Sequence, residues 1–213
     1  MAALQRRACS AKFPPMPSDD PISVALAVAA AFDSVGIAYF LGGSMASSLQ
    51  GEPRSTNDID FVISSEEESV AKLSASLGPD FDVDDAALRD AVRTIGSWNI
   101  FHLPSMLKID LFVLGREPFD RSEFSRRRRV PVRADGAELF VKTPEDSILR
   151  KLRWYLDGGG VSDRQWRDVV EVLRVSGPLL DVEYLDLWAK AIGVAAVLVE
   201  ARAEADSFRP GRG

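Results

Sequence analysis

Two aspartates that interrupt an apolar stretch are the residues in this sequence best placed to do chemistry. Asp58 and Asp60 lie one residue apart in DIDFVI, residues 58–63, which otherwise has the alternating pattern of a strand. Residues i and i+2 of a strand point to the same face, so the two carboxylates share a side of the sheet. Carboxylates this close repel each other unless a cation lies between them. The pair is therefore either a metal site or, in the simpler interpretation, a loop end followed by a solvated edge residue.

A third acid interrupts another apolar stretch. Asp110 lies in KIDLFVL, residues 108–114, which is also predicted to be a strand. Three acids on neighbouring strands offer the oxygen ligands that Mg²⁺ prefers, and Mg²⁺ is usually shared with substrate phosphates. Asp58, Asp60 and Asp110 are therefore the candidate metal ligands and catalytic residues.

A glycine-rich turn comes before the two aspartates. Gly42, Gly43 and Ser44 follow the apolar sequence IAYFL, residues 37–41. Glycines let the backbone approach an anion, and the amides at a helix start, with the Ser44 hydroxyl, can hold phosphate oxygens. Ser44 is also predicted to cap the short helix MASSLQ, residues 45–50. A lone Gly-Gly-Ser turn is common, but this turn followed by Asp-x-Asp on the next strand indicates a site for a metal-bound triphosphate.

These motifs together resemble the nucleotidyltransferase superfamily of the DNA polymerase β type. In that superfamily an apolar residue and a Gly-Gly-Ser type of turn precede Asp-x-Asp, and a third acid follows on a later strand. The matching positions are Leu41 to Ser44, then Asp58, Asp60 and, on the later strand, Asp110. Residues 54–61 look especially like minimal bacterial members, including toxins of the abortive-infection (AbiEii-like) group.

The resemblance implies a fold and an activity. The fold would be the α/β (α+β) nucleotidyltransferase fold, with a mixed β-sheet flanked by helices and then a C-terminal helical bundle. The activity would be transfer of NMP from an NTP to a hydroxyl acceptor: an RNA such as tRNA, a protein, or a small molecule such as an aminoglycoside or lincosamide. Asp58 and Asp60 would bind two Mg²⁺ ions, with Mn²⁺ as a substitute, and Asp110 would bind the ion that activates the acceptor hydroxyl.

Two other functions stay open at this point. The chain could be a catalytically silent member of the fold that binds a nucleotide or a partner protein, although silent members often lose one acid and this chain keeps three. It could also be a toxin whose activity is masked by an antitoxin protein.

The resemblance continues into two later helices. Lys151 lies in ILRKLRWYL, and Arg167 and Asp168 begin the pattern Arg-Asp-x-x-Glu, in which Glu171 replaces the final Asp of the family. The resemblance implies that these residues belong to the nucleotide site, with Lys151 neutralising phosphates as a point charge. The simpler interpretations are a solvated basic helix face for Lys151 and a helix ion pair for Arg167 and Asp168.

The loop before the aspartates holds two further candidates. Arg54 and Thr56 flank the Asp-x-Asp pair, where they either touch phosphate or brace the loop. With Gly42, Gly43 and Ser44, they complete the predicted nucleotide-binding set in this half of the chain.

The change of periodicity along the chain predicts its domains. Residues 22–142 are predicted to form the nucleotidyltransferase α/β domain, and residues 143–205 a C-terminal helical domain that starts at Thr-Pro-Glu-Asp. Residues 1–21 are rich in proline and are predicted to be a flexible N-terminal segment. Residues 206–213 are predicted to be a disordered tail.

Composition limits the class of protein. The chain has 213 residues, 46% of them hydrophobic and 27% charged, and a net charge of −6, which argues against attraction of the whole surface to nucleic acid. The single cysteine, Cys9, excludes an internal disulfide and fits a reducing compartment. No apolar run approaches the roughly 20 residues that a membrane helix needs. We therefore expect a cytoplasmic protein without a membrane partner.

Overall fold

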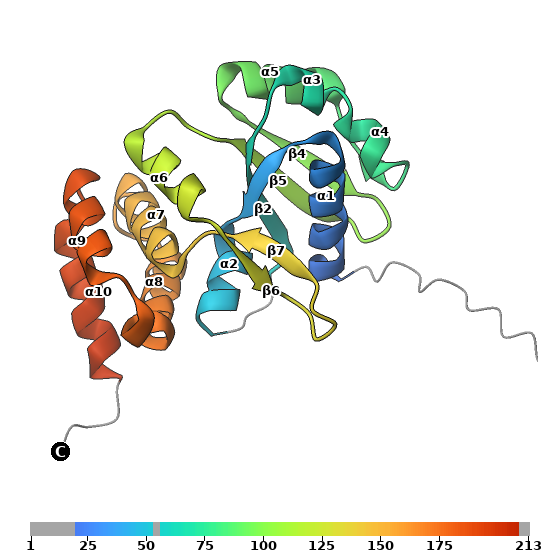
Figure 1. Ribbon diagram of the computed structural model, residues 1–213. Coiled ribbons are helices and arrows are strands. Elements are labelled where there is room, and N and C mark those ends of the chain that lie inside the picture. Colours follow the sequence, from blue (N-terminus) through green and yellow to red (C-terminus); the bar gives the residue numbers. More distant parts are fainter. Residues whose placement is uncertain (1–19, 53–55, 209–213) are drawn as a thin grey trace, which may run out of the picture.

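A seven-stranded mixed sheet forms the centre of the molecule (Figure 1). The computed structural model describes residues 20–52 and 56–208. The strand order is β3-β4-β5-β2-β1-β7-β6. The strands are β1 (Ala38–Leu41), β2 (Asp58–Ser64), β3 (Phe81–Asp82), β4 (Ser97–His102), β5 (Leu107–Val113), β6 (Arg128–Pro131) and β7 (Glu138–Val141). The predicted mixed sheet flanked by helices is confirmed, since β2 pairs parallel with β5 and antiparallel with β1.

One face of the sheet carries the main apolar core. In β2 the residues alternate between half-buried and buried, and Ile59, Phe61 and Ile63 are fully buried. They pack with residues of the helices that cover this face, such as Val28 and Phe32. These helices are α1 (Pro21–Val35), α3 (Glu67–Val70), α4 (Leu73–Leu77) and α5 (Asp85–Thr94). Because side chains alternate along a strand, the acids of β2 must face the opposite way.

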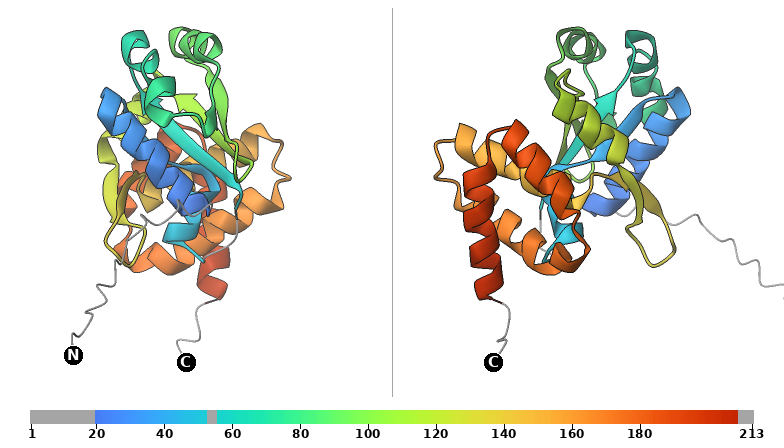
Figure 2. Two further views of the ribbon diagram at one scale, coloured as in Figure 1. Left: turned by 90° about the vertical axis from the view of Figure 1, so that its right-hand side faces the viewer. Right: turned by 60° about the vertical axis from the view of Figure 1, so that its left-hand side comes forward.

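A second apolar cluster joins the C-terminal helices to each other. It contains Leu149 and Leu152 of α7, Val169 and Leu173 of α8, and Leu198 of α10. Figure 2 shows these helices as a layer of their own, on the side of the sheet away from α1. They are α7 (Pro144–Asp157), α8 (Asp163–Ser176), a 3₁₀ turn (Gly177–Leu179), α9 (Val182–Ala191) and α10 (Ala195–Ser207).

Some helix boundaries agree with those predicted from the sequence, and others differ. Thr143 caps α7, and its hydroxyl accepts a hydrogen bond from the Asp146 amide at 3.3 Å, which confirms the predicted helix start. The helix α10 continues to Ser207, two residues into the predicted tail. The rest of that tail beyond residue 208, and the predicted N-terminal segment up to residue 19, lie outside the described residues. Within the part of the chain that is described, no helix is both long and apolar enough to cross a membrane.

One helix was not predicted. Helix α6 (Pro118–Arg126) lies between the sheet and the C-terminal helices, and Phe119 joins the second apolar cluster. It begins with a capping box, in which the side chains of Glu117 and Asp120 bond reciprocally to backbone amides. Its charged sequence hides the apolar periodicity by which the other helices were found.

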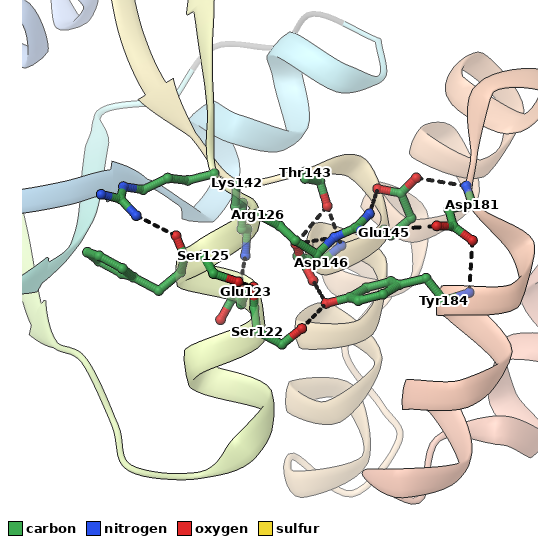
Figure 3. Close-up of polar contacts among 12 residues, drawn as sticks. Ser122, Glu123, Ser125, Arg126, Lys142, Thr143, Glu145, Asp146, Asp181 and Tyr184 are labelled. Atoms are coloured by element: carbon green, nitrogen blue, oxygen red, sulfur yellow. Dashed lines mark hydrogen bonds and ion pairs between the residues drawn. The ribbon is translucent and has the colours of Figure 1, made fainter.

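Polar contacts tie α6, α7 and α9 together (Figure 3). The Tyr184 hydroxyl of α9 donates to Asp146 Oδ1 of α7 at 2.7 Å and lies 2.9 Å from Ser122 Oγ of α6. The Arg126 guanidinium lies over the Tyr184 ring, 3.7 Å from its centroid. Burial raises the pKa of Tyr184, and the Asp146 charge raises it further, so the hydroxyl stays protonated as a donor.

Replacing this hydroxyl therefore leaves a buried carboxylate short of a donor. Tyr184→Phe is expected to lower the free energy of unfolding by about 1–3 kcal/mol, measured as a shift of the urea midpoint at constant slope. Tyr155→Phe is the matched control, because that ring packs on Trp166 at 5.2 Å between centroids and should keep its packing. Equal midpoints for the two variants would contradict the role given to Tyr184.

Candidate functional site

The register of β2 against β5 brings the three predicted acids to one face of the sheet. Asp60 stands directly opposite Asp110, and Asp58 stands opposite Lys108. Residues directly opposite in a ladder have side chains within reach of each other. The face that carries them is the one away from the α1 layer, turned toward the C-terminal helices (Figure 1).

Burial and two neighbouring carboxylates set Asp60 apart from the other acids on this face. Burial raises the pKa of the Asp60 carboxyl above its usual value, and the charges of Asp110 and Asp58 raise it further. The cations Lys142 and Lys151 act in the opposite direction. The face therefore has an excess of negative charge that another cation would relieve.

Lys108 neutralises part of this negative charge. Its ammonium lies 2.8 Å from Asp110 Oδ2, so the third acid is engaged in an ion pair. Among residues 20–52 and 56–208, no group of three or more histidine, cysteine, aspartate or glutamate side chains is arranged to hold a metal ion. Mg²⁺, however, is typically held by one or two carboxylates together with substrate phosphates and water. The donors Asp58 and Asp60 fit that mode, and Asp110 could join them once Lys108 moves away.

The glycine turn touches the acids directly. The Gly42 amide donates to the Asp60 carbonyl oxygen at 2.7 Å. Gly43 has φ +53°, and a side chain at this position would collide with the Asp60 carboxylate. The predicted cap at Ser44 is wrong: Gly42 is the N-cap of α2 (Gly43–Gln50), and Ser44 lies inside the first turn. Glycine at 43 is therefore required by close approach as well as by backbone conformation.

Lys151 is buried and bridges α7 and α8. It is 2% exposed, and its ammonium donates to Asp168 Oδ2 at 2.8 Å and to Gln165 Oε1 at 3.2 Å. The simpler interpretation of Lys151 as part of a solvated basic face is therefore wrong. Asp168 is likewise buried and pairs across two helices, which differs from an ion pair within its own helix.

A cleft of about 700 Å³ opens beside Asp58. It brings together four of the predicted residues, since Thr56, Asp58, Arg167 and Asp168 all line it. The other residues on its wall are Asn57, Asp163 and Arg164. Arg54, predicted to flank this site, lies outside the described residues.

Arg164 is a site residue that sequence reasoning missed. It lies in the first turn of α8, a helix capped by Ser162. Its Nη2 donates to Ser44 Oγ at 2.7 Å, so a guanidinium reaches the glycine turn from the helical layer. Its partner is 120 positions away in the chain, and no local pattern could have pointed to it.

Comparison with known proteins identifies the fold. Neither a scan against protein-family models nor a search of curated proteins finds a match. Among solved structures, the chain is similar to an antigenic nucleotidyltransferase-like protein from Paracoccidioides brasiliensis, with 20% identity, a TM-score of 0.53, and coverage of 90% of this chain and 95% of that one. It is also similar to the antibiotic-resistance factor ANT(2'')-Ia, with 17% identity, a TM-score of 0.49, and coverage of 85% and 96%. The first likeness confirms the predicted nucleotidyltransferase fold, and the subgroup of abortive-infection toxins stays a prediction.

The raised pKa of Asp60, caused by burial and then by the charges of Asp110 and Asp58, has a consequence for stability. A carboxyl whose pKa is higher in the folded than in the unfolded state binds more protons when folded, so stability falls as pH rises through that range. Asp60→Asn removes this penalty. In EDTA at neutral pH the variant is expected to melt at a higher temperature than the unmodified protein, and the gain should shrink as the pH is lowered toward 3.8, the usual aspartate value.

The matched control is Asp82→Asn, at an exposed position on the edge strand β3. It should change the melting temperature little at any pH. A lower melting temperature for Asp60→Asn at neutral pH, or a gain that does not depend on pH, would contradict this account of Asp60.

Proposed function

We propose that this protein transfers a nucleoside monophosphate from an NTP to a hydroxyl acceptor, with Mg²⁺ as cofactor. The observation that carries the proposal is the pairing of Asp60 with Asp110 on parallel strands, with Asp58 on the same face. The turn at Gly42 and Gly43, in contact with Asp60, supports it. So does the fold shared with a nucleotidyltransferase-like protein.

Asp58 and Asp60 would hold the metal together with the phosphates of the substrate. When bound, Mg²⁺ supplies positive charge to the phosphoryl group that is transferred. Asp110 would act on the hydroxyl of the acceptor. Its release from Lys108 frees a carboxylate beside Asp60, and frees an ammonium for the phosphates as well.

The glycine turn and the arginines of the first cleft would together hold the triphosphate. The amides of Gly43 and Ser44 at the start of α2 can donate to phosphate oxygens, and Arg164 and Arg167 supply guanidinium groups suited to phosphate. Lys151 adds a buried charge that already acts on Asp60. Of these groups, Arg164 and Arg167 line the cleft beside Asp58 and would draw the leaving pyrophosphate to that side.

The chemical step then needs few further groups. The acceptor oxygen attacks the α-phosphorus, the bond from that phosphorus to the bridging oxygen of the β-phosphate breaks, and pyrophosphate leaves. The proton of the acceptor hydroxyl passes to the carboxylate of Asp110, which stands beside Asp60.

A second candidate function is nucleotide or partner binding without catalysis. One observation favours it: the Lys108 ammonium lies 2.8 Å from Asp110 and so occupies the acid that would act on the acceptor. If Lys108 keeps that contact when an NTP is bound, the site binds but does not transfer.

Transfer of label separates the two candidates. Each NTP, labelled at its α-phosphate, is incubated with the protein, Mg²⁺ and either total RNA, total protein or a small-molecule extract. The proposed function predicts label on one acceptor class and a loss of about a hundredfold or more with Asp60→Asn, while Asp82→Asn labels normally. NTP binding without any labelled acceptor would favour the second candidate.

Arg164 gives a test of the triphosphate site alone. Arg164→Ala is expected to weaken binding of NTP and of inorganic tripolyphosphate by about 10- to 150-fold, the loss of one charged hydrogen bond. Binding of the matching NMP should change little. Calorimetric titration in Mg²⁺ measures all three ligands, and Arg93→Ala, an exposed arginine paired with Asp90, is the control. Equal losses for NMP and tripolyphosphate would remove Arg164 from the phosphate tail.

A further inference from the structure

A second cavity, of about 390 Å³, lies on the other side of Asp60. It is bounded by the far ends of β2 and β5, by β1 and the glycine turn at Gly42 and Gly43, and by α6 and α7. Asp58 lines the first cleft and Asp60 lines this one. Since successive residues of a strand rise by about 3.3 Å, the two spaces open at neighbouring points along β2. Asp60 therefore lies between the proposed reaction centre and this second space, and Gly42 and Gly43 of the glycine turn also line it.

The walls of the second cavity are largely apolar and aromatic. They include Phe40 of β1, Val62 of β2, Phe112 of β5 and Trp154 of α7. Phe40 is fully buried, whereas Phe112 and Trp154 are 37% and 41% exposed and so form the mouth. Flat rings of this kind pack well against another ring.

The polar wall is internally neutralised. The Arg150 Nη2 lies 2.6 Å from Glu123 Oε2 and 2.8 Å from Asp120 Oδ1, and the Lys142 ammonium lies 3.5 Å from Glu123 Oε1. Glu123 and Lys142 are each 3% exposed. On this wall two cations therefore pair with two carboxylates, and among the described residues that line the cavity Asp60, which would hold the metal, is the one further charged group.

We propose that this second cavity binds the acceptor, as an uncharged molecule or end group that carries a hydroxyl on or beside a flat ring. The inference rests on the proposed function. In an in-line displacement the attacking and leaving oxygens lie on opposite sides of the phosphorus. Arg164 and Arg167 draw the leaving pyrophosphate to the first cleft, so the attacking hydroxyl comes from the side of Asp60 where the second cavity lies.

The volume and the wall charges of the second cavity limit which acceptors it can bind. A space of 390 Å³ lies at the lower end of the range for small-molecule pockets, about 300–1,000 Å³. A polycation or a polyanion gains no ion pair from the wall, because Lys142 and Arg150 are already paired with Glu123 and Asp120. An RNA or a protein enters only through a single ring-bearing group, such as a terminal nucleoside or an aromatic side chain.

Filling the cavity tests the proposal. Val62→Trp places a large side chain in the second cavity, and Val199→Trp makes the same exchange at a position of α10 that is 64% exposed. Two probes are titrated: 4-fluorophenol, an uncharged ring with a hydroxyl, followed by ¹⁹F NMR line broadening, and a non-hydrolysable NTP analogue with Mg²⁺, followed by calorimetry. Val62→Trp is expected to weaken 4-fluorophenol binding by about tenfold or more, because a filled cavity excludes the ring, and to leave the analogue unchanged. Val199→Trp should leave both unchanged.

A variant that enlarges the cavity guards against misfolding of Val62→Trp. Phe112→Ala removes a wall at the exposed mouth and should also weaken 4-fluorophenol binding while the analogue still binds. Loss of the NTP analogue in either variant means that the cavity holds the nucleobase, which overturns the proposal. Failure of the unmodified protein to bind 4-fluorophenol, or equal binding by all variants, overturns it as well. Failure of the unmodified protein to bind the analogue, in contrast, overturns the proposed function itself.

Discussion

Repulsion among Asp58, Asp60 and Asp110 is the constraint on which the rest of the site depends. The alternation of β2 forces it, because Ile59 and Phe61 must be buried on one face and the carboxylates then share the other. A slip of one residue in register would bury the acids and expose the apolar side chains. The apolar core therefore holds the acids together, and burial, followed by their mutual repulsion, raises the pKa of Asp60.

Buried cations of the C-terminal layer offset part of this repulsion. Lys142, just before α7, and Lys151, within it, both act on Asp60, and each has an acidic partner of its own, Glu123 or Asp168. Removing one partner of a buried pair typically costs about 3–5 kcal/mol, because the other charge is left unpaired. The helical layer is thus part of the electrostatics of the site, and the sheet alone would be left with three acids and too little positive charge.

Local patterns in the sequence predicted those features of the site that depend only on residues close together in the chain. The strand of Asp58 and Asp60, the turn before Ser44 and the helix start at Thr143 depend on neighbours a few positions away. The pairing of Asp60 with Asp110 is a register between distant strands, and no pattern in one sequence reports it. Helix α6 left a usable signal, because its capping box and first-position proline are local, but its charged surface hid the helical period.

The two spaces beside the acids differ in the property that matters most for a transfer reaction. The first cleft presents Arg164 and Arg167, which an anionic phosphate tail can pair with. In the second, between Phe40 and Phe112, both cations are already paired with Glu123 and Asp120. The first cleft therefore favours the anionic triphosphate and the second cavity favours an uncharged acceptor, so the two substrates bind in different places before the reaction. Apolar walls also exclude water, and water is the acceptor that would compete for the α-phosphate, so the same side chains that receive a ring would protect the NTP from hydrolysis.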